Sequence, residues 1–358
     1  MHVLWVTEAA DFRGGAERHV ADTATRLGER GIRSTLLYGP DCAPDPRFTN
    51  RFDAAFPWVD VGPQIADIAP DIIYVHQLRG TGPIMELAAR SIPVVRFFHD
   101  HGPFCLRRHK YTAIGRHTCR RPLGIHCYPC LGFLNRGDGW SGLSLNTLAR
   151  ARAELAANRR FDAFITGSEY MKGHVVAHGF DPSRIHVNPL FVEPPGPEPS
   201  RPRDPGRLLF VGALLRGKGL DILLDAMGRL GPEVHLNVVG GGAQEPLFRR
   251  MRAALKLEGR VRFLGPLEAA DLDRQYREAA CVVAPSREPE TFGLIGPEAF
   301  RHGTPVIASD AGGMGEWLRH KTTGLMFKSG DSTDLADAVR EMLGNPEKAR
   351  DIGSRGRG

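Results

Sequence analysis

The sequence predicts an α/β protein built from two doubly wound domains, and three observations lead to this prediction. A chain of 358 residues is long enough to form two hydrophobic cores. In both halves, short apolar runs typical of strands alternate with amphipathic stretches typical of helices. Between the halves lies a Pro-rich segment that can form neither a helix nor a central strand. We therefore expect an N-terminal domain (1–192), a linker (193–206) and a C-terminal domain (207–358).

Composition and charge narrow the classes of partner. The chain is 42% apolar and 25% charged, with a formal charge of +6. No basic run is interleaved with aromatic residues, so nucleic-acid binding is not expected. No apolar run is long enough to span a membrane, and the first residues lack the charged region of a signal peptide. We expect a cytoplasmic protein. The basic charge leaves open an anionic substrate, peripheral contact with the inner face of the membrane, or a merely solvated surface.

The N-terminal domain begins with a β-loop-α-β unit. A strand at 2–7 leads into a loop that contains Gly14 and Gly15, and a helix follows and ends near Gly31. Further strands are expected at 32–38, 71–76, 93–98 and 161–166, with helices at 82–91 and 143–158. Glycines after a first strand either make a turn or let a phosphate approach the backbone.

The strand at 93–98 ends in a histidine pair, His99 and His101. Side chains at the carboxyl end of a parallel strand face the crevice where such sheets bind ligands. His99 and His101 are therefore candidates for such a role, and a structural or metal-proximal histidine is the alternative interpretation.

Four of the six cysteines form a cluster with the spacing C-x13-C-x7-C-x2-C, namely Cys105, Cys119, Cys127 and Cys130. In a chain without an export signal, four thiolates favour a structural zinc site over disulfides. Free or redox-active thiols, disulfides and an iron–sulfur cluster are the alternatives, and a histidine could replace a cysteine as ligand (His109, His117 or His126). We expect an insertion at about 102–135. Its basic residues could meet an anionic acceptor or lipid headgroups, or simply be solvated: Arg107, Arg108, Lys110, Arg116, Arg120 and Arg121.

The C-terminal domain restarts the α/β alternation with a strand at 207–212. The loop after it contains Arg216 and Lys218. A second strand ends in a glycine run that starts at Gly240, where no side chain would obstruct a nucleotide. The last helix is expected at about 332–343.

Two carboxylates, Glu290 and Glu298, flank a turn in the stretch 286–303. Apolar runs before and after it predict a strand, a loop, a short helix and a second strand. Pro297 suits the first helical turn, which would place Glu298 there and Glu290 in the preceding loop. Carboxylates accept hydrogen bonds from hydroxyls, and the free N–H groups of a helix start suit a phosphate. Ordinary acidic residues near a helix N-terminus are the alternative interpretation.

This stretch resembles the E-x7-E motif of the retaining glycosyltransferases of family 4, together with their companion pattern E-x-F-G-L. The resemblance covers nearly the whole chain and implies the GT-B fold, in which two Rossmann-like domains face each other across a cleft. It implies transfer of a sugar from a UDP- or GDP-sugar to an acceptor hydroxyl on a glycan, a lipid-linked sugar or a small molecule. Cysteine clusters recur in a subgroup that builds surface polysaccharides or modifies secondary metabolites.

The resemblance also implies roles for residues in the C-terminal domain. Glu290 would hold hydroxyls of the donor sugar and Glu298 those of the ribose. Lys218 would neutralise the leaving diphosphate. The arginine expected beside it is replaced by Ala213, so Arg216 would have to substitute. The remaining donor contacts would be made largely by backbone groups of Gly240, Phe263, Leu264, Phe292, Gly293 and Leu294.

In the N-terminal domain, the resemblance places His99 against the donor sugar, and Gly14 and Gly15 near the diphosphate and the acceptor. No protein nucleophile and no catalytic metal are implied. Family members usually have a further C-terminal helix that crosses onto the first domain, and none is expected after about residue 343. Two other functions stay open, a nucleotide-sugar epimerase with the GT-B fold and a non-catalytic protein that binds nucleotide-sugar.

Overall fold

The computed structural model describes residues 1–112, 117–136, 143–192 and 203–357. The chain divides into two compact units. The first unit comprises Met1–Arg108 and Arg120–Leu190, and the second comprises His109–Cys119 and Phe191–Gly358. Arg116 and the Pro-rich part of the expected linker, 193–202, lie outside the described residues.

The first unit contains a seven-stranded parallel sheet with the strand order β3-β2-β1-β4-β5-β8-β9. Its strands are β1 (His2–Thr7), β2 (Arg33–Tyr38), β3 (Ala54–Pro57), β4 (Ile72–Val75), β5 (Val94–Phe98), β8 (Ala163–Thr166) and β9 (Ile185–Val187). Its helices are α1 (Gly15–Gly28), α2 (Pro46–Thr49), α3 (Val61–Ile68), α4 (Thr81–Ala88), α5 (Leu148–Asn158) and α6 (Glu169–Val176). β2 and β3 lie on one side of β1, and the strands from β4 onward lie on the other side. The topological switch point of this doubly wound sheet is therefore between β1 and β4.

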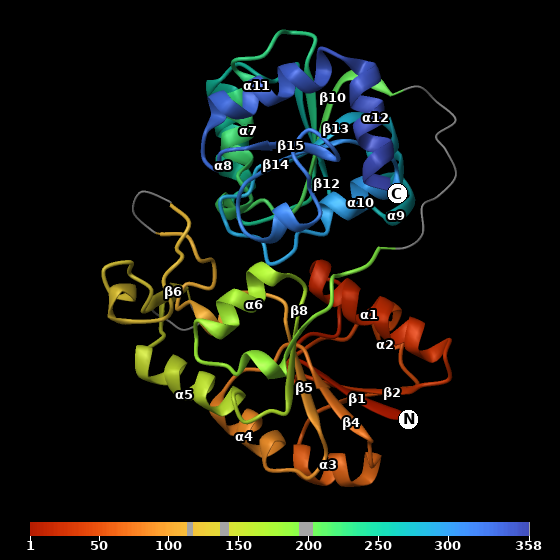
Figure 1. Ribbon diagram of the computed structural model, residues 1–358, viewed down its shortest axis with the longest axis vertical. Helices are drawn as coiled ribbons and strands as arrows, with labels where there is room; N and C mark the ends of the chain where they lie inside the picture. The colour runs from red at the N-terminus through yellow and green to blue at the C-terminus, as the bar shows by residue number, and fades with distance from the viewer. Residues whose placement is uncertain (113–116, 137–142, 193–202, 358) are drawn as a thin grey trace. The chain divides into compact units, whose positions relative to one another are not determined.

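The central strand β1 is buried on both faces and supplies two separate cores. Leu4 and Val6 pack into a cluster with residues of α3 to α6, whereas Val3 and Trp5 pack into a cluster with residues of α1 and α2. Because successive side chains of a strand point to opposite faces, this alternation places helices on both sides of the sheet, as Figure 1 shows.

The second unit repeats this plan with a six-stranded parallel sheet of order β12-β11-β10-β13-β14-β15. Its strands are β10 (Asp204–Val211), β11 (His235–Val239), β12 (Val261–Gly265), β13 (Ala279–Ala284), β14 (Val306–Ser309) and β15 (Gly324–Phe327). Its helices are α7 (Leu220–Met227), α8 (Glu245–Ala254), α9 (Ala269–Glu278), α10 (Ile295–Arg301), α11 (Ser332–Leu343) and α12 (Pro346–Arg357). Leu208 and Leu209 of β10 again enter opposite cores. The predicted α/β architecture of two doubly wound domains is therefore confirmed.

Two sequence predictions about helices were wrong. The stretch expected as one helix at 143–158 begins with a strand, β7 (Leu143–Leu145), which pairs antiparallel with β6 (Leu134–Arg136). The helix itself starts only at Leu148, where the hydroxyl of Thr147 accepts a hydrogen bond from the backbone N–H of Arg150 and caps it.

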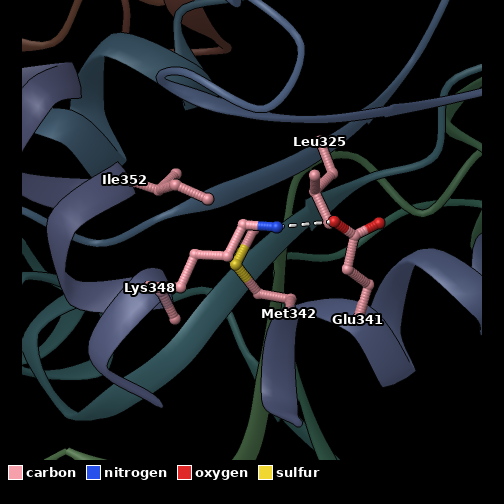
Figure 2. Close-up of a pocket in the computed structure, with 6 residues that line it drawn as sticks. Leu325, Glu341, Met342, Lys348 and Ile352 are labelled. Atoms are coloured by element: carbon pink, nitrogen blue, oxygen red, sulfur yellow. Dashed lines mark hydrogen bonds and ion pairs between the residues drawn. The ribbon is translucent and has the colours of Figure 1, made fainter. Parts of the chain in front are cut away.

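The second error concerns the end of the chain, where α12 follows α11. Ile352 of α12 is buried in the core, and Lys348 Nζ donates to Glu341 Oε1 of α11 at 2.8 Å. Figure 2 shows this pair beside the apolar side chains of the small crevice between α11, α12 and β15. None of the described helices is both long and apolar enough to cross a membrane.

Candidate functional site

The donor residues predicted in the second unit lie at or beyond the carboxyl end of its parallel sheet. Lys218 follows β10 and Glu290 follows β13, and these are the two strands on either side of the switch point. In open α/β sheets, the crevice at this point is where ligands bind. Two residues 72 positions apart in sequence are thereby brought into contact.

Lys218 and Glu290 form an ion pair, with Lys218 Nζ donating to Glu290 Oε1 at 2.7 Å. The Ser286 hydroxyl donates to the same carboxylate oxygen, also at 2.7 Å. Burial by itself would lower the pKa of Lys218, but attraction to Glu290 and Glu288 outweighs burial and raises the pKa. The site therefore holds a permanently charged ammonium group that is only partly exposed to solvent.

Backbone contacts fix the loop that carries Lys218. A short 3-10 turn, Arg216–Lys218, ends at Gly219 in the left-handed region (φ +73°). A Cβ on Gly219 would lie 1.7 Å from the carbonyl oxygen of Pro285, so only glycine allows the two loops to approach this closely. The carbonyl of Gly217 also accepts hydrogen bonds from the amides of the loop after β13.

Glu290 is held by the turn after β14. Its carbonyl accepts a hydrogen bond from the Gly313 amide at 2.7 Å. Gly312 lies at φ +76°, and a Cβ there would be 2.3 Å from the Glu290 carbonyl oxygen. Sequence reasoning did not connect these glycines with Glu290, because nothing local shows that the turn lies against it.

The turn that follows Glu290 presents backbone N–H groups. The Phe292 carbonyl is engaged, since it accepts a hydrogen bond from Trp317 Nε1 at 2.6 Å. Among the described residues, by contrast, no acceptor is found for the amides of Phe292, Gly293 and Leu294. Amides without internal partners at the start of α10 are available to an anionic ligand.

Glu298 occupies the first turn of α10, as predicted. Its Oε2 accepts a hydrogen bond from the hydroxyl of Tyr276 at 2.8 Å, and the Tyr276 ring is buried and stacked on His302. The carboxylate therefore has a fixed orientation.

The other predicted donor positions lie at the neighbouring strand ends. The amide of Gly240 donates to the Gly265 carbonyl at 2.9 Å, which ties the end of β11 to the end of β12. The Phe263 ring packs under the guanidinium groups of Arg249 and Arg252, 4.7 and 5.7 Å from its centroid. This side chain serves packing, which leaves backbone groups as the ligand contacts at this strand end.

The side chain of Arg216, predicted to replace the missing family arginine, is half-buried. Its guanidinium has no hydrogen-bond or ion-pair partner in the part of the chain that the structure describes. The Arg216 amide donates to the side-chain oxygen of Gln244, which fixes the backbone. Ala213 is exposed two residues beyond β10.

In the first unit, His99 lies at the end of β5 and is joined to His76 at the end of β4. His76 Nδ1 and His99 Nε2 are 2.7 Å apart. Burial lowers the pKa of both imidazoles well below the ordinary value, and both are therefore neutral at pH 7. His19 of α1 stands edge-on to His99, and burial lowers the pKa of His19 to about 4.

The tautomer of this pair follows from the other nitrogen of His76. The ring of His76 is 3% exposed and stacks on Trp5, and its Nε2 has no hydrogen-bond partner among the described residues. A buried donor without a partner is less tolerable than a buried acceptor, so the proton of His76 belongs on Nδ1. His99 Nε2 then accepts, and His99 carries its own proton on Nδ1.

Sequence reasoning missed His76, although a signal was present. His76 ends the expected strand 71–76 and His99 directly follows the expected strand 93–98, and neighbouring parallel strands bring their carboxyl ends together. His101, the alternative to His99, is also buried, but its ring stands against His174 rather than His76.

The loop with Gly14 and Gly15 is exposed and leads into α1, with Gly14 as its N-cap. The buried carboxylate of Glu17 lies in the first helical turn and accepts a hydrogen bond from Gln77 Nε2 at 2.9 Å. A negative charge in the first turn opposes binding of an anion there, but it suits hydroxyl groups.

The four clustered cysteines give the zinc prediction no support. Three of them, Cys105, Cys127 and Cys130, belong to the first unit, and Cys119 belongs to the second. In the residues placed by the structure, no three His, Cys, Asp or Glu side chains form a group that could hold a metal. All six cysteines are described, and none forms a disulfide.

Zinc therefore stays a prediction, which elemental analysis of the purified chain tests. A tetrathiolate site predicts about one zinc atom per chain. Fully folded, metal-free protein would contradict it.

Comparison with known proteins decides the family. Residues 13–195 match the family described as Glycosyltransferase Family 4, and residues 197–358 match Glycosyl transferases group 1. The chain belongs to glycosyltransferase family 4. The D-inositol 3-phosphate glycosyltransferase of Mycolicibacterium smegmatis is 33% identical over 363 residues, which cover 92% of this chain and 79% of the relative. The enzyme of the same name from Geodermatophilus obscurus is 33% identical, covering 93% and 78%.

Solved structures of the same fold agree with this assignment. Anabaena HepE, solved in complex with UDP and glucose, superposes with a TM-score of 0.73 at 20% identity, over 100% of this chain and 94% of that one. Sucrose-phosphate synthase from Thermosynechococcus elongatus gives a TM-score of 0.74 at 20% identity, over 100% and 93%. The family 4 chain therefore has the GT-B fold and is a glycosyltransferase.

Proposed function

We propose that this glycosyltransferase transfers a sugar from a nucleoside-diphosphate donor to an acceptor hydroxyl with retention of the anomeric configuration. The observation that carries the proposal is the Lys218–Glu290 ion pair at the switch point of the second sheet. It places a permanent cation beside a carboxylate and beside amides without internal partners. The ammonium group and the amides can hold a diphosphate, and the carboxylate can accept hydrogen bonds from sugar hydroxyls.

Lys218 would change partner when the donor binds. The diphosphate carries more charge than the Glu290 carboxylate, so the ammonium group would turn toward it and stabilise the charge that develops as the leaving group departs. Glu290 would then be released to accept hydrogen bonds from sugar hydroxyls. Arg216, which has no side-chain partner in the described chain, would supply a second cation in place of the arginine missing at Ala213.

Glu298 would accept hydrogen bonds from the ribose hydroxyls, with its carboxylate oriented by the Tyr276 hydroxyl. His99 would contact the donor sugar, as the resemblance implies, and His76 would orient its ring through the hydrogen bond to His99 Nε2. No side chain in this scheme forms a covalent bond to the sugar, because attack on the face of the departing diphosphate needs only positioning and charge stabilisation.

A donor screen tests the proposal. The chain is incubated with UDP- and GDP-sugars, first without an acceptor and then with a panel of glycans, lipid-linked sugars and polyols, including the phosphorylated inositol after which two relatives are named. We expect slow hydrolysis of one donor and faster turnover with one acceptor class, and NMR of the product should show the anomeric configuration of the donor.

The same experiment separates the alternatives. Conversion of the donor sugar itself without an acceptor would indicate a nucleotide-sugar epimerase. Tight nucleotide binding by calorimetry with no turnover on the whole panel would indicate a binding protein. An inverted product would refute the retaining mechanism but keep the glycosyltransferase.

A further inference from the structure

The cysteine-rich segment of the first unit exposes a concentration of apolar side chains. Of the eleven large apolar residues that are exposed in the described chain, five lie between residues 125 and 145. We call these five the apolar stripe: Ile125 (76% exposed), Tyr128 (44%), Leu131 (48%), Leu134 (39%) and Leu145 (68%). Single exposed apolar residues are ordinary, whereas a cluster of them marks an interaction surface.

Backbone hydrogen bonds order the stripe. Its first four members recur every third residue, and the N–H of each donates to the carbonyl of the one before: Tyr128 to Ile125 at 3.1 Å, Leu131 to Tyr128 at 2.8 Å, and Leu134 to Leu131 at 3.2 Å. Leu134 and Leu145 are direct partners in the antiparallel pair β6–β7. Partners in such a pair point to the same face, so the ladder extends the stripe by one side chain.

The loop that carries the stripe is attached to the domain beneath it. The Gly132 amide donates to the Cys127 carbonyl at 3.0 Å, and a Cβ on Gly132 would lie 3.0 Å from that of the buried Leu106. The Arg107 guanidinium donates to the Cys130 carbonyl at 3.3 Å, and the Leu123 amide donates to His178 Nε2 at 3.0 Å. These contacts attach the loop to the domain and leave the five apolar side chains exposed.

The positive charge of the whole chain is concentrated in the segment of the sequence that contains the stripe. Residues 105–153 contain nine Arg and Lys against a single Asp, whereas the rest of the chain has 38 Arg and Lys against 40 Asp and Glu. The exposed Arg120 and Arg121 precede the stripe, and the exposed Arg150 and Arg152 follow it on α5. An apolar surface flanked by arginines matches the interface of an anionic bilayer, where apolar groups enter the acyl boundary and basic groups meet phosphates.

We propose that the apolar stripe docks the first unit onto the surface of an anionic lipid bilayer. Stable attachment needs two signals, and the stripe supplies the apolar one while the arginines supply the electrostatic one. Each basic residue near an anionic surface contributes roughly fivefold in affinity. This inference does not depend on the proposed function, because docking involves neither the donor nor the acceptor.

Vesicle flotation tests the proposal with the full chain and no sugar substrate. We expect binding to vesicles of phosphatidylcholine mixed with phosphatidylglycerol, and at least tenfold weaker binding to phosphatidylcholine alone. The variant L131S/L145S should lose at least tenfold in binding, and R120E/R121E should lose about as much and become insensitive to salt. V59S is the matched control, because Val59 is 85% exposed in the same unit but outside the stripe, and it should bind like the wild type.

A second measurement keeps the test valid if the Ser variants unfold. In Leu131→Trp, brominated lipids should quench the added fluorescence only in anionic vesicles. Equal binding to neutral and anionic vesicles, or wild-type binding by folded L131S/L145S, would overturn the proposal. So would a dimer in light scattering that dissociates in L131S/L145S, because the stripe would then be an interface between copies of this chain.

Discussion

The two sheets share one strand order over six strands, to which the first unit adds a seventh, but the carboxyl ends of their strands carry different chemistry. The second unit places a charged pair, Lys218 and Glu290, across its switch point and fixes both loops through glycines. The first unit places neutral imidazoles at the ends of β4 and β5 and a carboxylate, Glu17, at the start of α1. One topology therefore supports two kinds of ligand surface, one suited to an anion and one suited to hydroxyl groups.

The largest effect is expected from removing the charged pair. Lys218→Ala and Glu290→Ala should each lower turnover roughly a hundredfold, the usual cost of losing one contact to the transition state. The double variant should lose less than the product of the two, because the residues act as a unit. Steady-state kinetics of all three variants measure this.

The pair Lys348–Glu341 is a matched control. It joins α12 to α11 with the same geometry, 2.8 Å between Lys348 Nζ and Glu341 Oε1, in the same unit. Lys348→Ala should leave turnover within about twofold, because exposed ion pairs contribute little. If both lysine variants were equally impaired, the effect at Lys218 would have to be attributed to stability.

A smaller loss of turnover is expected when the loop that carries Glu290 is displaced than when the Glu290 side chain is removed. Gly312→Ala would place a methyl group 2.3 Å from the Glu290 carbonyl oxygen and would also strain a residue at φ +76°. Gly330→Ala also places a non-glycine residue at positive φ (+87°), but with no atom within 4 Å of the added methyl group, so it should lose about 1 kcal/mol of stability. Gly312→Ala should lose more stability because of its clash, and only this variant should also lower turnover, by about tenfold. Thermal unfolding and kinetics on both variants separate the two effects.

Substitutions in the first unit should lower turnover less than those in the second. His76→Phe keeps a ring against Trp5 but removes the hydrogen bond to His99, so we expect a fall in kcat of about fivefold with little change in the KM of the donor. His186→Ala, an exposed histidine of β9, should have no effect. Unchanged kcat in folded His76→Phe would show that His76 does not position His99.

Replacing His19 should have the smallest effect on stability at neutral pH and a larger effect in acid. Its pKa is lowered to about 4 in the folded state from 6.5, so the unfolded chain binds a proton that the folded chain does not. The stability it confers is fully present above about pH 6.5 and is lost as the pH falls toward 4, by up to about 1.4 kcal/mol per pH unit. The free energy of unfolding, measured with urea at pH 7 and pH 5, should fall less in His19→Gln than in the wild type. An equal fall in the variant would contradict this.

The sequence predicted the sheets and the positions of the loops that carry Lys218 and Glu290 well, because both depend on local patterns. Apolar alternation located β1 and β10, and glycines beside charged residues located the loops of Lys218 and Glu290. Contacts between distant segments could not be predicted from the sequence: nothing near Gly312 shows that it supports Glu290. The position of His76 at a strand end indicates a neighbour on the next strand, but not a hydrogen bond to His99. The tail was misjudged for a related reason. Gly353 and Gly356 look like helix breakers, but each occupies a place in α12 where a Cβ would collide, with the Gly303 carbonyl oxygen at 2.1 Å and with the Phe300 ring at 2.4 Å.

Those two glycines have a consequence for the position of Glu298. They let α12 lie directly against α10, and α10 is the helix that carries Glu298 in its first turn. The last helix thus supports α10, and a side chain at either glycine would displace α10 together with Glu298. Because we propose that Glu298 holds the ribose, we expect such a variant to bind the donor more weakly.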